Sequence, residues 1–167
     1  TNRGSFVHPE IGYNFRMTDL QASLGLSQLE KFEEIKSKKI KIFKRYCELL
    51  ENVKEVEILI PEKRVTSYIP FRTILMTKDN NAKDLMEYMS NLGIESRTTF
   101  FPLHKQPCYQ KLAQKQFFHH NQIEMKEALR NSINAYERGV CLPSYPSLED
   151  DEIQYVCKTI KSFYNRR

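Results

Sequence analysis

Hydrophobic positions recur with a helical period along the first third of the chain. Between residues 18 and 52, apolar side chains return every three or four residues and form one stripe. The members of this stripe are Leu20, Leu24, Phe32, Ile35, Ile42, Phe43, Tyr46, Leu49 and Leu50. Because no strong breaker interrupts the stretch, it predicts one long helix, or two helices that share a bend near residues 25–31.

After residue 60 the pattern switches between strand-like and helical periods. Residues 65–76 alternate and are rich in β-branched side chains, which predicts a strand; Pro70 suggests a sheet edge or a bulge. The later predicted elements are helices at 82–92, 122–138 and 147–164, and strands at 94–101 and 140–142. Gly93 and Gly139 end the first two of these helices, and Ser147 caps the last. This order predicts an α+β fold: a three-stranded, mainly antiparallel sheet covered by helices, with a long N-terminal helix.

Size and charge exclude several classes of protein. A chain of 167 residues with 40% hydrophobic and 28% charged residues is long enough for one domain with its own core. No apolar run approaches the roughly 18 residues that cross a bilayer, and no signal-peptide pattern is present, so no membrane partner is expected. The net charge of +5 comes from Lys and Arg interleaved with Glu along helices, which predicts a solvated face and no nucleic-acid partner.

The four cysteines predict free thiols. Cys47, Cys108, Cys141 and Cys157 are scattered, without a CxxC motif or paired histidines at zinc-finger spacing. Buried thiols in a reducing cytoplasm account for them better than disulfides or a metal, so the expected localisation is cytoplasmic and no metal site is expected.

The stretch GYNFRMTDLQASLGL at residues 12–26 joins an aromatic and polar segment to a helix start. Thr18 is a good N-cap, and Gln21, three residues on, can complete a capping box. Tyr13, Asn14 and Arg16 are therefore held on a short segment at a helix entry. An amide and a guanidinium suit phosphate or carboxylate; alternatively, Asn14 satisfies backbone groups in a turn and Arg16 pairs with a surface acid.

This stretch resembles the signature of the DegT/DnrJ/StrS family of pyridoxal-phosphate-dependent nucleotide-sugar aminotransferases. Two further matches follow in the family's order: GIESR at 93–97 with PLHKQP at 102–107, and LPSYPSL at 142–148. The resemblance covers most of the chain. It implies the small C-terminal domain of a fold-type-I aminotransferase, working as a homodimer with pyridoxal phosphate as its cofactor.

In the resembling enzymes the signature lies in the second half of the polypeptide, whereas here it falls within the first residues after Thr1. The resemblance therefore implies a C-terminal portion. Residues 1–17 would be a connector from a large N-terminal domain, and residues 18–167 the C-terminal small domain. The Schiff-base lysine and the acid at the pyridine nitrogen lie in that large domain, so no catalytic residue is assigned here and the chain alone is not expected to transaminate.

The resemblance also suggests binding residues. Asn14 would hydrogen-bond the cofactor phosphate of a neighbouring subunit, and Tyr13 and Arg16 would line the same edge, although an inter-subunit salt bridge is an equal alternative for Arg16. His104, in a loop bounded by prolines, would approach the nucleotide-sugar together with Arg97 and Tyr109.

Two alternatives concern these loops. His104 could be an ordinary hydrogen-bonded loop histidine, and Tyr145, between two prolines, is expected to pack more than to contact a ligand. The sequence departs from the family at residues 66–72: family members usually carry an aromatic residue or histidine next to the position of Ile69, followed by a residue other than proline, whereas here Pro70 follows Ile69.

The implied reaction is the transfer of an amino group from glutamate, the amino-acid donor, to a keto-deoxy nucleotide-sugar in polysaccharide biosynthesis. A perosamine-synthase-like enzyme acting on a 4-keto-6-deoxy sugar is favoured over a 3-keto sugar. The alternative is a non-catalytic, stand-alone binding or interaction domain derived from such an enzyme.

Overall fold

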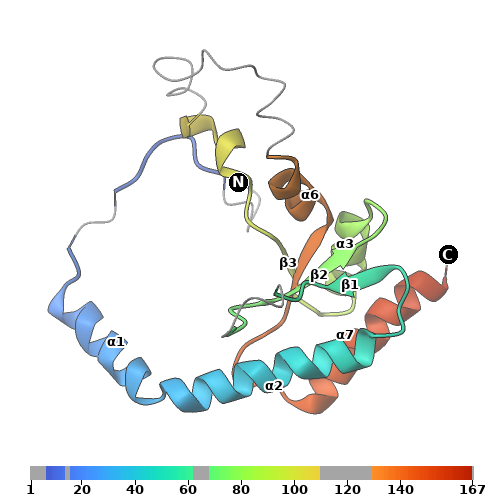
Figure 1. Ribbon diagram of the computed structural model, residues 1–167, viewed down its shortest axis with the longest axis horizontal. Coiled ribbons are helices and arrows are strands. Elements are labelled where there is room, and N and C mark those ends of the chain that lie inside the picture. Colours follow the sequence, from blue (N-terminus) through green and yellow to red (C-terminus); the bar gives the residue numbers. More distant parts are fainter. Residues whose placement is uncertain (1–6, 14–15, 62–67, 110–128, 167) are drawn as a thin grey trace.

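The computed structural model describes residues 7–13, 16–61, 68–109 and 129–166 (Figure 1). Its first two helices, α1 (Asp19–Glu30) and α2 (Phe32–Leu50), meet at Lys31. Of the two alternatives predicted, that of two helices sharing a bend is therefore confirmed, and that of a single long N-terminal helix is wrong. The predicted capping box is confirmed as well, because the Gln21 N–H donates to Thr18 Oγ1 over 3.3 Å and Gln21 Oε1 accepts from the Thr18 N–H over 2.9 Å.

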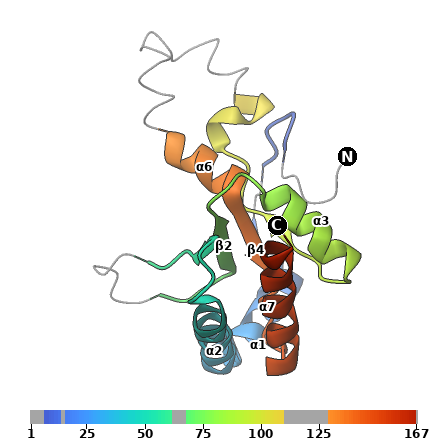
Figure 2. The same ribbon diagram turned by 90° about the vertical axis from the view of Figure 1, so that its right-hand side faces the viewer.

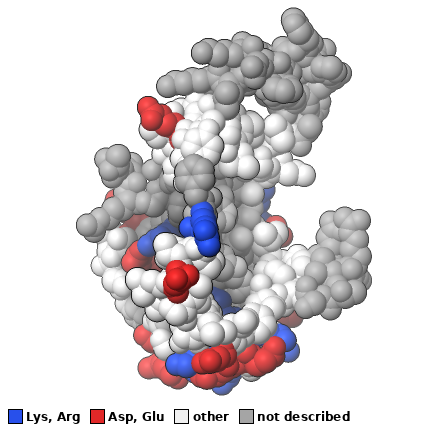
Figure 3. All heavy atoms as spheres, turned by 90° about the vertical axis from the view of Figure 1, so that its left-hand side faces the viewer, with Lys and Arg blue, Asp and Glu red and all other residues white. Residues whose placement is uncertain are grey.

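Helix α1 stands apart from the rest of the described chain (Figure 1). None of its residues is buried, and its four leucines are at least 60% exposed. On the face of the molecule that Figure 3 shows, Lys, Arg, Asp and Glu side chains gather along the lower edge. A helix this apolar is normally covered, so we expect α1 to contact another polypeptide surface.

The sheet contains four antiparallel strands in the described residues. These are β1 (Val56–Ile58), β2 (Thr73–Thr77), β3 (Arg97–Thr98) and β4 (Gly139–Leu142), in the spatial order β1-β2-β4-β3. The prediction of three strands is wrong, because the three-residue β1 is too short to stand out as a periodic pattern.

The strand predicted at 65–76 needs a second correction. Pairing begins only at Thr73, Pro70 lies before the strand, and residues 65–67 lie outside the described residues. Because β2 is flanked by β1 and β4, it is an inner strand of the sheet and not the edge strand that Pro70 suggested. The strand expected at 94–101 is likewise reduced to the two residues of β3.

One face of the sheet forms the core. Leu75 and Val140 are fully buried there, together with Tyr46 of α2 and Ile160 of α7 (Asp150–Asn165). Helices α2 and α7 lie side by side against this face, and α3 (Ala82–Asn91) packs on α7 (Figure 2).

The helix ends follow the sequence signals in part. Gly93 adopts φ +77°, and the Ile94 N–H donates to the Met89 carbonyl over 2.9 Å, so glycine ends α3 as predicted. Helix α6 (Arg130–Arg138) ends at Gly139 as predicted, whereas residues 122–128 of that predicted helix lie outside the described residues. The N-cap of α7 is Glu149 and not Ser147; Glu149 and Glu152 form a capping box two residues further on.

Candidate functional site

The N-terminal segment is attached to the loop that follows β3. The His8 N–H donates to Gln106 Oε1 over 2.8 Å, and the Cys108 N–H donates to the His8 carbonyl over 3.3 Å. Gln106 is 3% exposed, so its amide is a buried anchor for residues far away in sequence. The predicted connector is therefore bound to the loop that carries two of the predicted substrate residues.

The predicted cofactor-edge residues lie beyond this anchor, where the chain runs out toward α1 (Figure 1). Tyr13 is 77% exposed and Arg16 is also exposed. Asn14, the residue expected to contact the cofactor phosphate, lies outside the described residues. Thr18 and Gln21 hold the helix entry as expected, and Arg16 lies two residues before that N-cap.

The two predicted loop residues sit on a short helical segment. His104 belongs to the 3₁₀ helix η1 (Leu103–Lys105) and is half-buried, while Tyr109 is 44% exposed just after it. Cys108, between them in sequence, is buried and free.

Arg97, the third predicted substrate residue, lines a separate pocket. The pocket, of about 880 Å³, lies between the end of the sheet, the segment 93–97 and the first turns of α7. Arg97 is the first residue of β3, and its guanidinium forms an ion pair with the Glu95 carboxylate over 3.0 Å. His104 and Tyr109 are not among its lining residues, so the structure does not bring the three predicted residues into one pocket.

Helix α2 fixes one wall of this pocket. Lys39 Nζ donates to the carbonyls of Phe71 and Ser144, and burial lowers the pKa of Lys39, with the nearby Arg72 adding to the effect. The Tyr46 hydroxyl donates to the Pro143 carbonyl over 3.0 Å. Both contacts join α2 to the loop after β4 and make the pocket wall part of the folded core.

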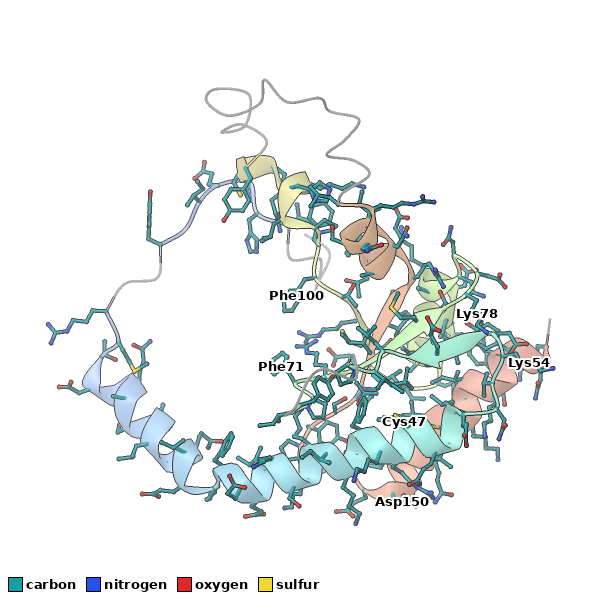
Figure 4. The ribbon with its side chains drawn as sticks, viewed as in Figure 1. Cys47, Lys54, Phe71, Lys78, Phe100 and Asp150 are labelled. Carbon is teal, nitrogen blue, oxygen red and sulfur yellow. The ribbon has the colours of Figure 1, made fainter. Side chains whose placement is uncertain are left out.

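The aromatic side chains near the pocket are exposed. Phe71 and Phe100 are 70% and 67% exposed and point away from the sheet on the side of α1 (Figure 4). Tyr145 was expected to pack, but it is about half exposed, lines the pocket and donates its hydroxyl to Glu152 over 3.2 Å. Phe71 and Tyr145, which both line the pocket, offer apolar surface to a ligand there.

Three pocket residues were not identified from the sequence. Lys39 lies three residues before Ile42 and seven before Tyr46, so it belongs to the inward-facing stripe of α2. A charged residue within an apolar stripe is unusual, and this position could have been identified from the sequence as a candidate site residue. Arg72 and Cys141 gave no comparable signal, because their proximity depends on the pairing of β2 with β4.

The cysteines match the prediction of free thiols. All four are free; Cys108, Cys141 and Cys157 are buried, and Cys47 is half-buried. Burial raises the pKa of Cys157 to about 12, which makes it unreactive near neutral pH.

The described segments offer neither a metal site nor a membrane-spanning helix. They contain no group of three or more His, Cys, Asp or Glu side chains that could hold a metal ion. Among the helices of these segments, none is both long and apolar enough to cross a membrane.

The described residues do not make a complete site for the pyridoxal phosphate implied by the resemblance. Such a site needs a free lysine amine, an acid at the pyridine nitrogen and a phosphate cradle. Lys39 is the lysine that lines the pocket, but its ammonium is held by two backbone carbonyls and lies 5.8 Å from the Phe71 ring centroid. We therefore assign no step of amino transfer to these residues.

The comparisons with known proteins agree on one family. The sequence profile of the DegT/DnrJ/EryC1/StrS aminotransferase family matches residues 1–161. GDP-perosamine synthase of Vibrio cholerae is 34% identical over 165 residues, which cover 96% of this chain and 41% of that protein. GDP-perosamine synthase of Escherichia coli O157:H7 is 31% identical over 160 residues, covering 96% of this chain and 40% of the relative.

Solved structures give the same fold. The putative sugar aminotransferase Spr1654 from Streptococcus pneumoniae aligns with a TM-score of 0.74 at 21% identity, covering 92% of this chain and 37% of that structure. Helicobacter pylori PseC, an aminotransferase involved in the biosynthesis of pseudoaminic acid, aligns with a TM-score of 0.71 at 19% identity, covering 95% and 40%. The chain thus spans about two fifths of the length of the proteins it matches. It belongs to the DegT/DnrJ/EryC1/StrS aminotransferase family.

Proposed function

We propose that this chain supplies the C-terminal portion of a pyridoxal-phosphate-dependent nucleotide-sugar aminotransferase. The family match over residues 1–161 carries the proposal, and the GDP-perosamine synthases among the relatives support it. The reaction would move an amino group from glutamate to a keto-deoxy nucleotide-sugar, with a 4-keto-6-deoxy sugar favoured. In this proposal residues 18–167 are the small domain, and a large N-terminal domain provides the lysine, the acid and most of the cofactor site.

The contribution proposed for this chain to the cofactor site comes from the entry of α1. Asn14 would donate its amide N–H to the cofactor phosphate of a neighbouring subunit, with Tyr13 and Arg16 beside it. Two features support this placement: the entry is held by the Thr18–Gln21 capping box, and α1 exposes all of its residues. An exposed apolar helix of this kind suits a homodimer interface or a contact with the large domain.

On the substrate side we assign Arg97, His104 and Tyr109 to contacts with the nucleotide-sugar. Arg97 lies at the pocket beside the sheet, and the other two lie in the loop that the N-terminal segment anchors. Because these positions belong to different surfaces of this domain, they would contact different parts of an extended ligand.

The test is the complete enzyme, in which this chain is joined to its natural N-terminal half. We expect bound pyridoxal phosphate by absorbance and amino transfer from glutamate to a keto sugar nucleotide. A complete protein without bound cofactor would contradict the proposal. If such a protein still bound a sugar nucleotide, the chain would instead belong to a non-catalytic binding domain.

In the complete enzyme, Asn14→Ala is expected to weaken cofactor retention about 10- to 100-fold, because it removes one hydrogen bond to a charged phosphate. The measurement is the release of pyridoxal phosphate on dialysis, compared with thermal unfolding of the apo-protein. Asn91→Ala, at the exposed end of α3, is the matched control and should change neither quantity. Equal losses of retention and stability in Asn14→Ala would assign the amide to a turn-stabilising role.

A further inference from the structure

Arg97 of β3 and Arg72, the residue before β2, line the same pocket as the buried Cys141. Arg97 of β3 and Ile74 of β2 are the Cα partners of Cys141 on either side of β4. Since side chains directly opposite one another in a sheet share a face, Arg97 and Cys141 point away from the face that packs Leu75 and Val140 into the core. Arg72, just before β2, lines the same pocket as Arg97 and Cys141.

The charges at Cys141 reflect this convergence. Burial raises the pKa of the Cys141 thiol, while the Arg72 guanidinium, through charge and a hydrogen bond, and the Arg97 charge lower it. A developing negative charge at this point is therefore opposed by desolvation and favoured by two cations.

The two guanidinium groups are available to a ligand. Among the described residues, no carboxylate forms an ion pair with Arg72, whose guanidinium carbon lies 5.5 Å from the centroid of the Phe71 ring. Arg97 pairs with Glu95, but the two side chains are 46% and 81% exposed. Exposed pairs of this kind contribute little free energy, so a ligand anion can displace Glu95.

The pocket has the size and polarity of a small-molecule site. Its volume of about 880 Å³ lies within the range of ligand pockets. Ser96 lines it too, and the Ser96 Oγ is buried without a hydrogen-bond partner in the described part of the chain. Asp151 and Glu152, in the first turn of α7, also line the pocket. The pocket therefore presents cations at the end of the sheet and hydrogen-bond acceptors at the helix.

We propose that Arg72 and Arg97 form an oxyanion-binding site in this pocket. Its ligand is a small molecule that joins a phosphoryl or carboxylate group to hydroxyl or ammonium donors. Arginine forks bind such oxyanions with two parallel hydrogen bonds. The donors of the ligand face Asp151 and Glu152, and the Ser96 hydroxyl is a further donor to the anion. Only the identity of the ligand rests on the proposed function, which offers two sources: a nucleotide-sugar or the amino-acid donor.

The test is calorimetric titration of the 167-residue chain with GDP-mannose and, separately, with L-glutamate. The Arg72→Gln/Arg97→Gln variant is compared with Lys36→Gln/Lys38→Gln, two lysines of α2 that do not line the pocket. Each double variant lowers the formal net charge from +5 by 2 to +3, so general charge effects are matched. We expect one probe to bind, the arginine variant to bind at least about tenfold more weakly, and the lysine variant to bind within about twofold of the parent.

The probe that binds identifies the source of the anion. Failure of both probes to bind, or equal loss of binding in the two double variants, would overturn the site.

Circular dichroism checks that the variants fold. If the arginine variant does not fold, alkylation of Cys141 in the parent chain replaces it: a saturating probe should slow iodoacetamide labelling of the Cys141 peptide at least about threefold, because it fills the space beside the sulfur. Unchanged labelling would overturn the site.

The outcome is separable from the proposed function. Binding that depends on the arginines supports the site even if the complete enzyme transfers no amino group. Conversely, amino transfer by a complete enzyme whose Michaelis constants are unaffected by Arg72→Gln would overturn the site and leave the proposed function intact.

Discussion

Replacing Leu75 with alanine is expected to lower the free energy of unfolding by about 3 kcal/mol, which corresponds to a fall of roughly 6–12 °C in Tm for a chain of this size. Leu75 is fully buried in an inner strand, and its Cα partners are Ile58 on one side and Val140 on the other. Truncation removes apolar contacts with the core and leaves a cavity that the paired strands cannot collapse to fill. Urea unfolding followed by far-UV circular dichroism measures the change.

The neighbouring residue provides the control. Ile74 points to the opposite face of β2 and is half-buried, so Ile74→Ala should cost less than half as much. Similar losses at both positions would mean that the outward face of the sheet is packed as tightly as the core. That result would also argue against an accessible ligand site beside Arg72 and Cys141.

The parts of the fold that the sequence predicts correctly are those encoded locally. The Thr18–Gln21 capping box and Gly93 at the end of α3 each involve residues a few positions apart, and each is present as expected. The long apolar stripe also identified α2, although the junction at Lys31 lies at the far end of the expected bend. Short-range chemistry determines such features before any tertiary contact forms.

The errors arise where distant segments decide the outcome. β1 is a strand because Val56 to Ile58 pair with β2, and β3 is shorter than expected because only Arg97 and Thr98 pair with β4. Pro70 suggested an edge strand, yet pairing starts three residues later, at Thr73. Local propensity contains no information about which partner a strand finds.

The predictions for the candidate site divide in the same way, into residues that local motifs indicated and a residue that only the folded sheet brings in. Sequence motifs indicated Arg97, His104 and Tyr109, and the structure assigns them to two places, a pocket beside the sheet and an anchored loop. Arg72 was missed because no motif contains it and only the sheet brings it to Cys141. The cofactor-edge role of Asn14 stays a prediction of the family resemblance.

Gly139→Ala is the other substitution with a large expected effect, a loss of about 2–3 kcal/mol in the free energy of unfolding. Gly139 joins α6 directly to β4 with φ −88°, so backbone strain is not the reason. An added Cβ would overlap the Ala135 carbonyl oxygen and lie 2.5 Å from Thr99 Cγ2. The Thr99 hydroxyl already donates to that carbonyl over 2.7 Å, so neither group can move without breaking this bond.

This clash couples stability to the candidate site, because Thr99 directly follows β3, whose Arg97 is the partner of Cys141. Gly139→Ala should therefore lower Tm by roughly 4–12 °C and also speed the alkylation of Cys141 as β3 separates from β4. Gly25→Ala is the matched control: Gly25 lies within α1 with nothing within 4 Å of an added Cβ. Alanine there should leave Tm unchanged or raise it slightly, since it favours the helix. A Gly139→Ala protein with the parent's Tm and labelling rate would show that Thr99 and the α6–β4 junction yield easily, and that the wall carrying Arg97 is adaptable.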